Sequence, residues 1–368
     1  MIVDSEMIGR AQSSLRTSFI ADALAMPVHW YYRTMDIQRA FDGGIQKFEA
    51  APQFHPSSIM SLHSTSSGGR QSSRNAPAPK IVGEVILKGK AQHWDVPNVH
   101  YHQGMAAGEN TLNAQCTRVL MRSMIANEHA YDKEAFVADY IAFMTAGTPL
   151  HNDTYAESYH RGFFANYVQG RAPLKCAMKT HDTASIGGLV TLAPLVFRLK
   201  LSGADISDIQ VSCREHIALT HPDEELMRVS DRYVILLCSL MDNPDEDNLK
   251  ILLAAAGKQH KSFDVAGLVK RDLPDQQVVG HIFSSACYIS DSWPVVLYLA
   301  YKYRNEPFKG LLANTNLGGD NVHRGMVLGA IFGLLTNDIA SQWFEKLVEH
   351  EAIGNEIDAL ISAAISPK

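Results

Sequence analysis

Three segments of the chain place side chains that bind metals or phosphates beside an expected helix terminus. Their sequences are FIADALAMPVHWYY from Phe19, GENTLNAQ from Gly108 and NLGGDNVHRG from Asn316. Free N–H groups and the positive dipole end of a helix N-terminus suit phosphate, and carboxylates that converge there suit a metal ion. The side chains of interest are Asp22, His29, Glu109, Asn110, Thr111, Asp320, Asn321 and His323.

Two further clusters have the spacing either of a site or of an ordinary surface. His160 and Arg161 follow Glu157 by three and four residues, so all three share one helix face. They are either substrate contacts or an exposed ion pair with a neighbouring histidine. In KTHDTASIGG, His181 and Asp182 are either substrate ligands or a helix cap. The segment before Glu157 adds His151, Asp153 and Tyr155.

A pair of histidines precedes Glu109, and no motif of nucleophilic catalysis accompanies it. His100 and His102 alternate on an extended segment, so both side chains are expected on one side. They either line the same cavity as Glu109 or are structural. The chain has no G-x-S-x-G, no G-x-G-x-x-G and no G-x-x-x-x-G-K-[ST], which excludes the nucleophile-elbow, dinucleotide-fold and P-loop classes.

Apolar residues recur at helical spacing through most of the chain, which predicts an all-α fold. The helix expected over 185–199 is apolar on nearly every face and should be central. Segment 61–80 is rich in Ser, Gly and Pro and predicts a mobile loop, and alternation over 80–89 predicts a strand or short hairpin. We expect one domain over 1–368 with an irregular insertion at about 51–103. The other expected helices are 13–25, 111–125, 133–144, 153–167, 223–240, 247–256, 283–303, 324–335 and 341–366.

The composition excludes several classes of partner. The formal net charge is −6 and no basic stripe stands out, which argues against nucleic-acid binding. No run of about 18 apolar residues predicts a membrane span, and the first residues lack the apolar core of a signal peptide. The 5 cysteines are scattered without a C-x-x-C, as in proteins of a reducing compartment. We expect a cytoplasmic protein without nucleic-acid or membrane partners, whose oligomeric state the sequence leaves open.

The order of the motifs resembles that of the ADP-ribosylglycohydrolase family, which includes the J-crystallins. ADALAMPVH (21–29), GENT (108–111) and NLGGDNVH (316–323) stand where that family has its three acidic motifs. THPDEE from Thr220, SACYISDSWPVVLYLAYK from Ser285 and the glycine-rich RGMVLGAIFGLL also fit. The resemblance runs from about Ala11 to Leu335 and implies a single orthogonal multi-helix domain.

The resemblance implies metal-assisted cleavage of the bond between an ADP-ribosyl C1″ and an acceptor atom, with a pair of Mg²⁺ ions held by aspartates. It also implies that the three motifs converge on one cleft, with Glu109 and Asp320 as catalytic carboxylates. The implied metal ligands are Glu109, Asn110, Thr111, Asp320, His323 and His29. The implied substrate-binding residues are Asp22, His181, Asp182, Gly187, Gly188, Gly318 and Gly319, whose glycines let a ribose or phosphate approach the backbone.

This sequence departs from the family at most of those ligands. His29 stands for a glutamate, Glu109 and Asn110 stand for paired aspartates, and Val322 stands for the second aspartate of the last motif. Three outcomes remain open: a site that has lost its metals, weakened Mg²⁺ binding, or one altered ion such as Zn²⁺ or Mn²⁺ held by histidines and carboxylates.

Three functions remain open as well. The first is a hydrolase acting on an ADP-ribosyl or related N- or O-ribosyl linkage, whose partner is an ADP-ribose-like molecule or an ADP-ribosylated protein. The second is an inactive protein that binds ADP-ribose or a nucleotide. The third is a crystallin-like structural protein. The helix-start loops favour the first two, and Val322 favours the last two.

Overall fold

Two antiparallel helices rich in small residues form the centre of the fold. In the computed structural model, which describes residues 5–60, 80–180 and 182–362, α1 (Ser5–Ala25) packs along α14 (Asn321–Leu335). A Cβ atom on Gly329 of α14 would lie 2.8 Å from the carbonyl oxygen of Thr17. The Ser14 hydroxyl donates to a backbone carbonyl of α14 at 2.6 Å. Glycine therefore lets the two backbones touch, which fixes the end of α1 against the start of α14.

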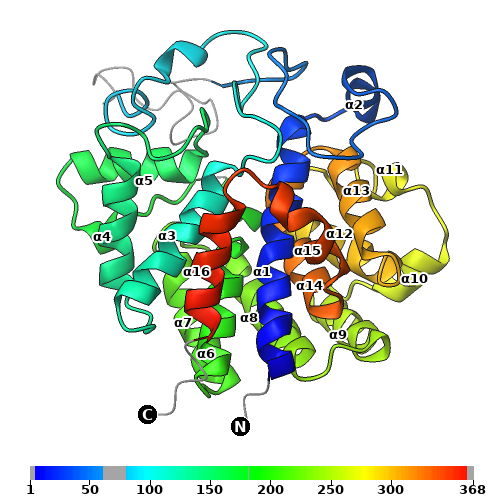
Figure 1. Ribbon diagram of the computed structural model, residues 1–368. Helices are drawn as coiled ribbons and strands as arrows, with labels where there is room; N and C mark the ends of the chain where they lie inside the picture. The colour runs from blue at the N-terminus through cyan, green and yellow to red at the C-terminus, as the bar shows by residue number, and fades with distance from the viewer. Residues whose placement is uncertain (1–4, 61–79, 181, 363–368) are drawn as a thin grey trace.

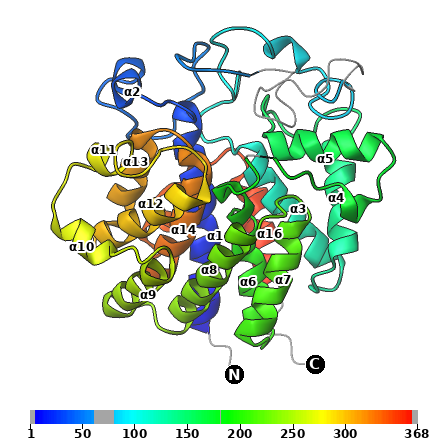
Figure 2. The same ribbon diagram turned by 180° about the vertical axis from the view of Figure 1, so that it is seen from behind.

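The remaining helices surround this pair (Figures 1 and 2). Apolar residues from both ends of the chain, including Met7 and Ile361, share one core. The other α-helices are α2 (Thr34–Ala40), α3 (Leu112–Ala126), α4 (Lys133–Met144), α5 (Ser158–Val168), α6 (Leu192–Leu201), α7 (Ile206–Ala218), α8 (Glu224–Asp242), α9 (Glu246–Gln259), α10 (Val265–Lys270), α11 (Asp275–Val278), α12 (Ile289–Lys302), α13 (Pro307–Leu317), α15 (Asp338–Trp343) and α16 (His350–Ser362). Five short 3₁₀ helices complete the described part: η1 (Met26–Val28), η2 (Ala91–His93), η3 (Pro173–Lys175), η4 (Ile186–Leu189) and η5 (Phe344–Lys346). The predicted all-α class is confirmed.

The irregular part of the chain lies across one end of the helical body. Figure 1 shows α2 and the loops around η2 at the top, above the end of α1, while α1 begins and α16 ends at the opposite side. The strand expected over 80–89 is wrong for the described residues, because only an isolated bridge joins Val82 to Ile86. The chain turns at Gly83, which has φ +90°. The apolar side chains of Val82 and Ile86 on either side of this turn are buried in the core, which explains the alternation without a strand.

Several predicted helix boundaries were wrong for physical reasons. The helix expected from Asp153 begins only at Ser158, because Asp153 uses both carboxylate oxygens to bind backbone N–H groups and stays in an extended segment. The helix expected over 185–199 is split into η4 and α6. The one expected over 341–366 is divided between α15 and α16, and its last residues lie outside the described part, as does nearly all of the loop expected at 61–80. None of the helices in the described part is both long and apolar enough to cross a membrane.

Candidate active site

A double-glycine turn joins three distant segments at the start of α14. Gly318 and Gly319 both have φ +64°, which favours glycine, and a Cβ atom on either would lie within 2.1 Å of a neighbouring carbonyl oxygen. The Gly319 N–H donates to the carbonyl of Tyr31 at 2.7 Å, and the Asp320 N–H donates to that of Ser285 at 2.9 Å. These glycines therefore hold Asp320 in place by close packing.

Arg324 supports the same turn from beneath. Its guanidinium is fully buried and donates to the Asn314 side-chain oxygen at 2.7 Å and to the Gly318 carbonyl at 2.9 Å. Burial lowers the pKa of Arg324 to about 10, so the group stays positively charged at neutral pH. The turn before Asp320 is thus tied to α13 and α14 together.

Two histidines flank Asp320 at the bottom of the resulting cleft. His29 follows η1 at the end of α1, and its Nε2 lies 3.3 Å from Asp320 Oδ1. His323, one helical turn into α14, has its Nδ1 2.7 Å from the same oxygen. One nitrogen of each ring and one Asp320 oxygen lie within 4.8 Å of one another, and all three side chains are buried.

A third histidine and a buried aspartate extend this cluster into the core. His102 Nε2 lies 2.7 Å from His29 Nδ1, and His102 Nδ1 lies 2.8 Å from Asp153 Oδ1. Asp153 also accepts the Leu112 N–H at the start of α3, at 2.7 Å. The rings of His29 and His102 are nearly parallel, with centroids 5.0 Å apart. A continuous chain of hydrogen bonds therefore runs from α3 to His29.

Charge and burial oppose each other at these groups. Burial alone would raise the pKa of Asp153, but the charge and hydrogen bond of His102 lower it to about 2. Burial lowers the pKa of His29 to about 3, so its ring is neutral. Burial would also lower the pKa of His323, but Asp320 and Glu157 outweigh it and raise that pKa to about 10. For Asp320, burial is opposed by both histidines, which hold its pKa well below the usual range. The carboxylates of Asp320 and Glu157 therefore favour a positive charge on the His323 ring, at the bottom of the cleft.

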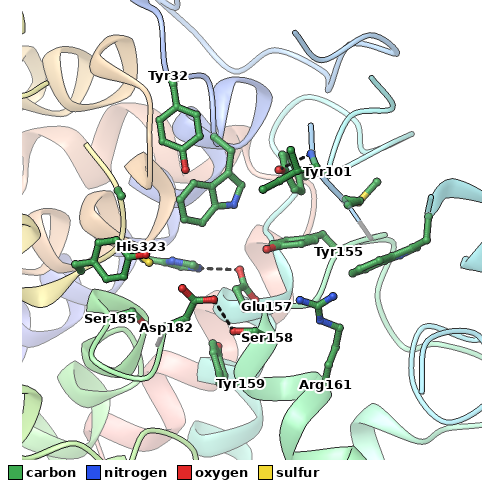
Figure 3. Close-up of a pocket in the computed structure, with 17 residues that line it drawn as sticks. Tyr32, Tyr101, Tyr155, Glu157, Ser158, Tyr159, Arg161, Asp182, Ser185 and His323 are labelled. Atoms are coloured by element: carbon green, nitrogen blue, oxygen red, sulfur yellow. Dashed lines mark hydrogen bonds and ion pairs between the residues drawn. The ribbon is translucent and has the colours of Figure 1, made fainter. Parts of the chain in front are cut away.

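His323 connects the buried cluster to a cavity of about 430 Å³. Its Nε2 lies 3.2 Å from Glu157 Oε1, and Figure 3 shows both side chains facing the open space, with Asp182 beside them. Asp182 accepts a hydrogen bond from the Ser158 hydroxyl at 3.0 Å. The cavity is lined by Trp30, Tyr32, Ile59, Met60, Trp94, Tyr101, Tyr155, Glu157, Ser158, Tyr159, Arg161, Asp182, Ser185, Ala286, Cys287, Tyr288 and His323.

Of the aromatic residues that line this cavity, only Tyr155 was a predicted candidate. Trp30 has φ +65°, an uncommon conformation for a bulky residue, and Arg161 places its guanidinium 5.0 Å from the centroid of the Trp94 ring. Tyr101 and Tyr155 meet edge to face with centroids 4.8 Å apart. Trp30, Trp94 and Tyr101 come from separate segments without a common motif, so no local sequence pattern predicts that they meet, whereas Tyr155 and Arg161 belong to the cluster predicted around Glu157.

Glu157 and its neighbours on α5 have divided roles. Glu157 and Arg161 line the cavity, whereas His160 is buried against α3 and α4. Its Nδ1 lies 2.6 Å from the Tyr140 hydroxyl, and its Nε2 lies 2.9 Å from the side-chain oxygen of Asn113. Asn113 also contacts His323 through its amide nitrogen. The α5 cluster is therefore neither an exposed ion pair nor a single ligand-facing surface.

Asp22 forms a separate buried cluster with the start of α3. Its carboxylate accepts hydrogen bonds from Asn110 Nδ2 at 2.7 Å, from the Thr111 N–H at 2.9 Å and from the Thr111 hydroxyl at 2.6 Å. Burial raises the pKa of Asp22 against the effect of these bonds. The three residues tie α1 to α3 at positions where metal ligands and a substrate contact were predicted.

The remaining predicted residues lie in different surroundings. Glu109 is half-buried and accepts hydrogen bonds from the Ala106 N–H and the Asn152 amide, and it is not among the residues that line the cavity. A Cβ atom on Gly187 would lie 3.7 Å from His323 Nδ1, whereas Gly188 packs against Leu226 and His221. His181 lies outside the described residues. Both ring nitrogens of His100 bind backbone groups. Its Nε2–H donates to the Pro27 carbonyl, and its Nδ1 accepts the His102 N–H.

The residues that are present do not fit a pair of Mg²⁺ ions. Mg²⁺ requires hard oxygen ligands in octahedral geometry, whereas the clustered donors are two imidazoles and one carboxylate. Val322 is fully buried and apolar, and Asn110 and Thr111 are engaged by Asp22. The described residues therefore do not provide the oxygen ligands that a magnesium pair needs.

Comparison with known proteins agrees with this architecture. The sequence model of the ADP-ribosylglycohydrolase family matches residues 4–367, so the chain belongs to that family. A solved structure titled an ADP-ribosylglycohydrolase-related protein complex superposes with a TM-score of 0.58 at 17% identity, over 98% of this chain and 100% of that one. At that identity the likeness shows the fold alone. Comparison with curated proteins gave no match. The predicted family is confirmed, and membership supports a hydrolase-like function in general.

Proposed function

We propose that this chain hydrolyses an ADP-ribosyl or related N- or O-ribosyl linkage in the aromatic cavity. The observation that carries the proposal is the position of Glu157 and His323 at the inner end of that cavity, 3.2 Å apart. Hydrolysis of a glycosidic bond passes through an oxocarbenium-like state that nearby carboxylates stabilise. Glu157 and Asp182 both face the space where the ribose would lie (Figure 3).

The cavity walls support an ADP-ribose-like substrate. Aromatic rings offer flat faces on which a purine stacks, and Arg161 supplies a buried guanidinium with the fork geometry that binds phosphate oxygens. A volume of about 430 Å³ lies in the range of small-molecule sites. The purine is expected against the exposed ring of Tyr32, with the terminal ribose against Glu157.

Glu157 is suited to accept a proton from the attacking water. Its Oε2 accepts no hydrogen bond and lies 3.7 Å from His160 Nε2, while its Oε1 is held by His323 and lies on the side of the cavity. Water then attacks C1″, its proton passes to Glu157, the bond from C1″ to the acceptor nitrogen or oxygen breaks, and Glu157 returns the proton to the departing acceptor, which leaves neutral. The negative charges of Glu157 and Asp182 stabilise the positive charge that develops on the ribose.

A hydrolysis assay tests this proposal. Peptides that carry N-linked or O-linked ADP-ribose are incubated with the protein, and free ADP-ribose is quantified by chromatography. Loss of a general base costs about 10²–10⁴-fold in rate, so Glu157→Gln should lower kcat by at least about 100-fold. Glu345→Gln, at an exposed glutamate, is the matched control and should change nothing. Turnover that survives Glu157→Gln would contradict the assigned role.

A second candidate is a protein that binds ADP-ribose without cleaving it. It is favoured by the position of Glu109 outside the cavity lining and by the apolar Val322, because both remove oxygens that the family uses. Calorimetric binding of ADP-ribose with no release from any ADP-ribosylated peptide would establish this function instead. If the protein neither binds ADP-ribose nor releases it from a peptide, the crystallin-like structural role is the remaining candidate.

A further inference from the structure

When His102 is uncharged, the hydrogen-bond chain behind His29 fixes where the protons on the His29 ring lie. Asp153 already accepts the N–H groups of Leu112 and Tyr155, and it can only accept from His102 Nδ1 as well. A neutral His102 then carries a lone pair on Nε2, which accepts the N–H from His29 Nδ1 at 2.7 Å. His29 Nε2 is left with a bare lone pair, directed toward Asp320.

That arrangement places unpaired acceptors against each other in the core. His29 Nε2 and Asp320 Oδ1 are 3.3 Å apart, and with this tautomer of His29 neither atom has a proton to share. Asp320 Oδ2 is buried without a partner, and His323 Nδ1 has no hydrogen bond of acceptable direction despite its 2.7 Å separation from Asp320 Oδ1. Acceptors buried as His29 Nε2 and Asp320 Oδ2 are cost folding free energy unless a cation lies beside them. For a metal ion to be that cation, His323 must release its ring proton when the ion binds.

The donor set selects the kind of cation. Two imidazole nitrogens and one carboxylate suit Zn²⁺ and its neighbours in the transition series, and three protein ligands are the number that a catalytic zinc site uses. Ligand atoms around a tetrahedral Zn²⁺ at about 2.0–2.1 Å lie about 3.4 Å from one another. The 3.3 Å between His29 and Asp320 is close to this spacing, whereas His323 Nδ1, at 2.7 Å from Asp320 Oδ1, has to move away from that oxygen to bind the same ion.

We propose that His29, Asp320 and His323 hold a single Zn²⁺-class ion where the family holds a pair of magnesium ions, and that His102 and Asp153 orient His29 toward it. A carboxylate that fixes the ring of a ligating histidine is the usual support of such sites. The alternative is a metal-free cluster in which a doubly protonated His102 donates to His29 Nδ1 as well as to Asp153, so that His29 Nε2 donates to Asp320. The inference stands on the ligand geometry and is independent of the proposed hydrolase activity.

Metal loading of the full chain separates these possibilities. Protein stripped with chelator is dialysed against Zn²⁺, Mn²⁺, Co²⁺ or Mg²⁺ separately, and bound metal is measured by plasma mass spectrometry. We expect about one Zn²⁺ per chain, a rise in melting temperature on loading, and intense visible absorption of the Co²⁺ form from tetrahedral coordination. Failure of the wild-type protein to hold Zn²⁺ or Mn²⁺, or binding of two Mg²⁺ ions instead, would overturn the proposal.

Variants then locate the bound ion. His323→Gln should abolish stoichiometric Zn²⁺ binding, and Asp153→Asn should weaken it by about 10–100-fold, the effect of losing a supporting carboxylate. His216→Gln, at a buried histidine of α7 that contacts Tyr131 and Thr191, is the matched control and should bind Zn²⁺ as the wild type does. Circular dichroism checks that each variant is folded. Zn²⁺ affinity equal to wild type in folded His323→Gln would show that the ion binds elsewhere.

Discussion

Replacing Asp22 with alanine tests whether this residue supports the fold or binds the substrate. The sequence predicted a substrate contact, but the carboxylate accepts three hydrogen bonds from Asn110 and Thr111, all buried. Asn110 Nδ2 keeps a bond to the Phe19 carbonyl at 2.8 Å after the change, whereas the Thr111 N–H and hydroxyl lose their partner. A buried donor without a partner costs about 1–3 kcal/mol.

The Asp22→Ala variant should therefore lose about 3–5 kcal/mol of unfolding free energy, when the cavity left by the side chain is included. Urea unfolding followed by circular dichroism measures this loss. Thr111→Val removes only the hydroxyl and should cost about 1–2 kcal/mol. ADP-ribose affinity, measured by calorimetry on the folded fraction, should change less than about threefold. A variant of near wild-type stability with a large loss of affinity would show that Asp22 is a ligand residue after all.

Three other changes test the fold and the site. Burial lowers the pKa of His216 to about 3. Between pH 6.5 and 4 the unfolded chain therefore binds a proton at this residue that the folded chain does not bind, and the free energy of unfolding decreases as the pH is lowered. His216→Gln should flatten that fall by about 1.4 kcal/mol per pH unit in urea titrations, and an unchanged slope would contradict a neutral buried ring. Gly329→Ala places a methyl group 2.8 Å from the Thr17 oxygen and should cost about 1–3 kcal/mol, whereas no cost would contradict the close contact of α1 and α14. Glu109→Gln should change the rate of ADP-ribose release by less than about threefold relative to the wild type, whereas a large loss of rate would show that Glu109 is part of the active site.

The sequence predicted the helical class and the family, because amphipathic periodicity and ordered motifs both survive divergence. Periodicity could not distinguish a helix from a buried irregular segment, so Asp153 was placed inside a helix although its carboxylate binds backbone N–H groups. Apolar alternation over 80–89 suggested a strand, but those side chains are buried at turns.

The candidate site was predictable only in part. His29, Asp320 and His323 stood on motifs and the structure brings them together. The contribution of His102 could be suspected from its spacing, but its bond to His29 depends on tertiary packing. Glu157 was left as either a substrate contact or a surface ion pair, because nothing in the sequence shows that α5 faces the cavity. The predicted roles of Glu109, Gly187 and the other site residues stay predictions.

A crystal structure of the protein with ADP-ribose is the most direct test of the proposed function. The account predicts that the terminal ribose lies against Glu157 and His323, that the diphosphate contacts Arg161, and that the adenine stacks among the aromatic rings of the cavity. ADP-ribose bound at another surface, or in this cavity with the adenine against Glu157 and the ribose outside, would contradict it.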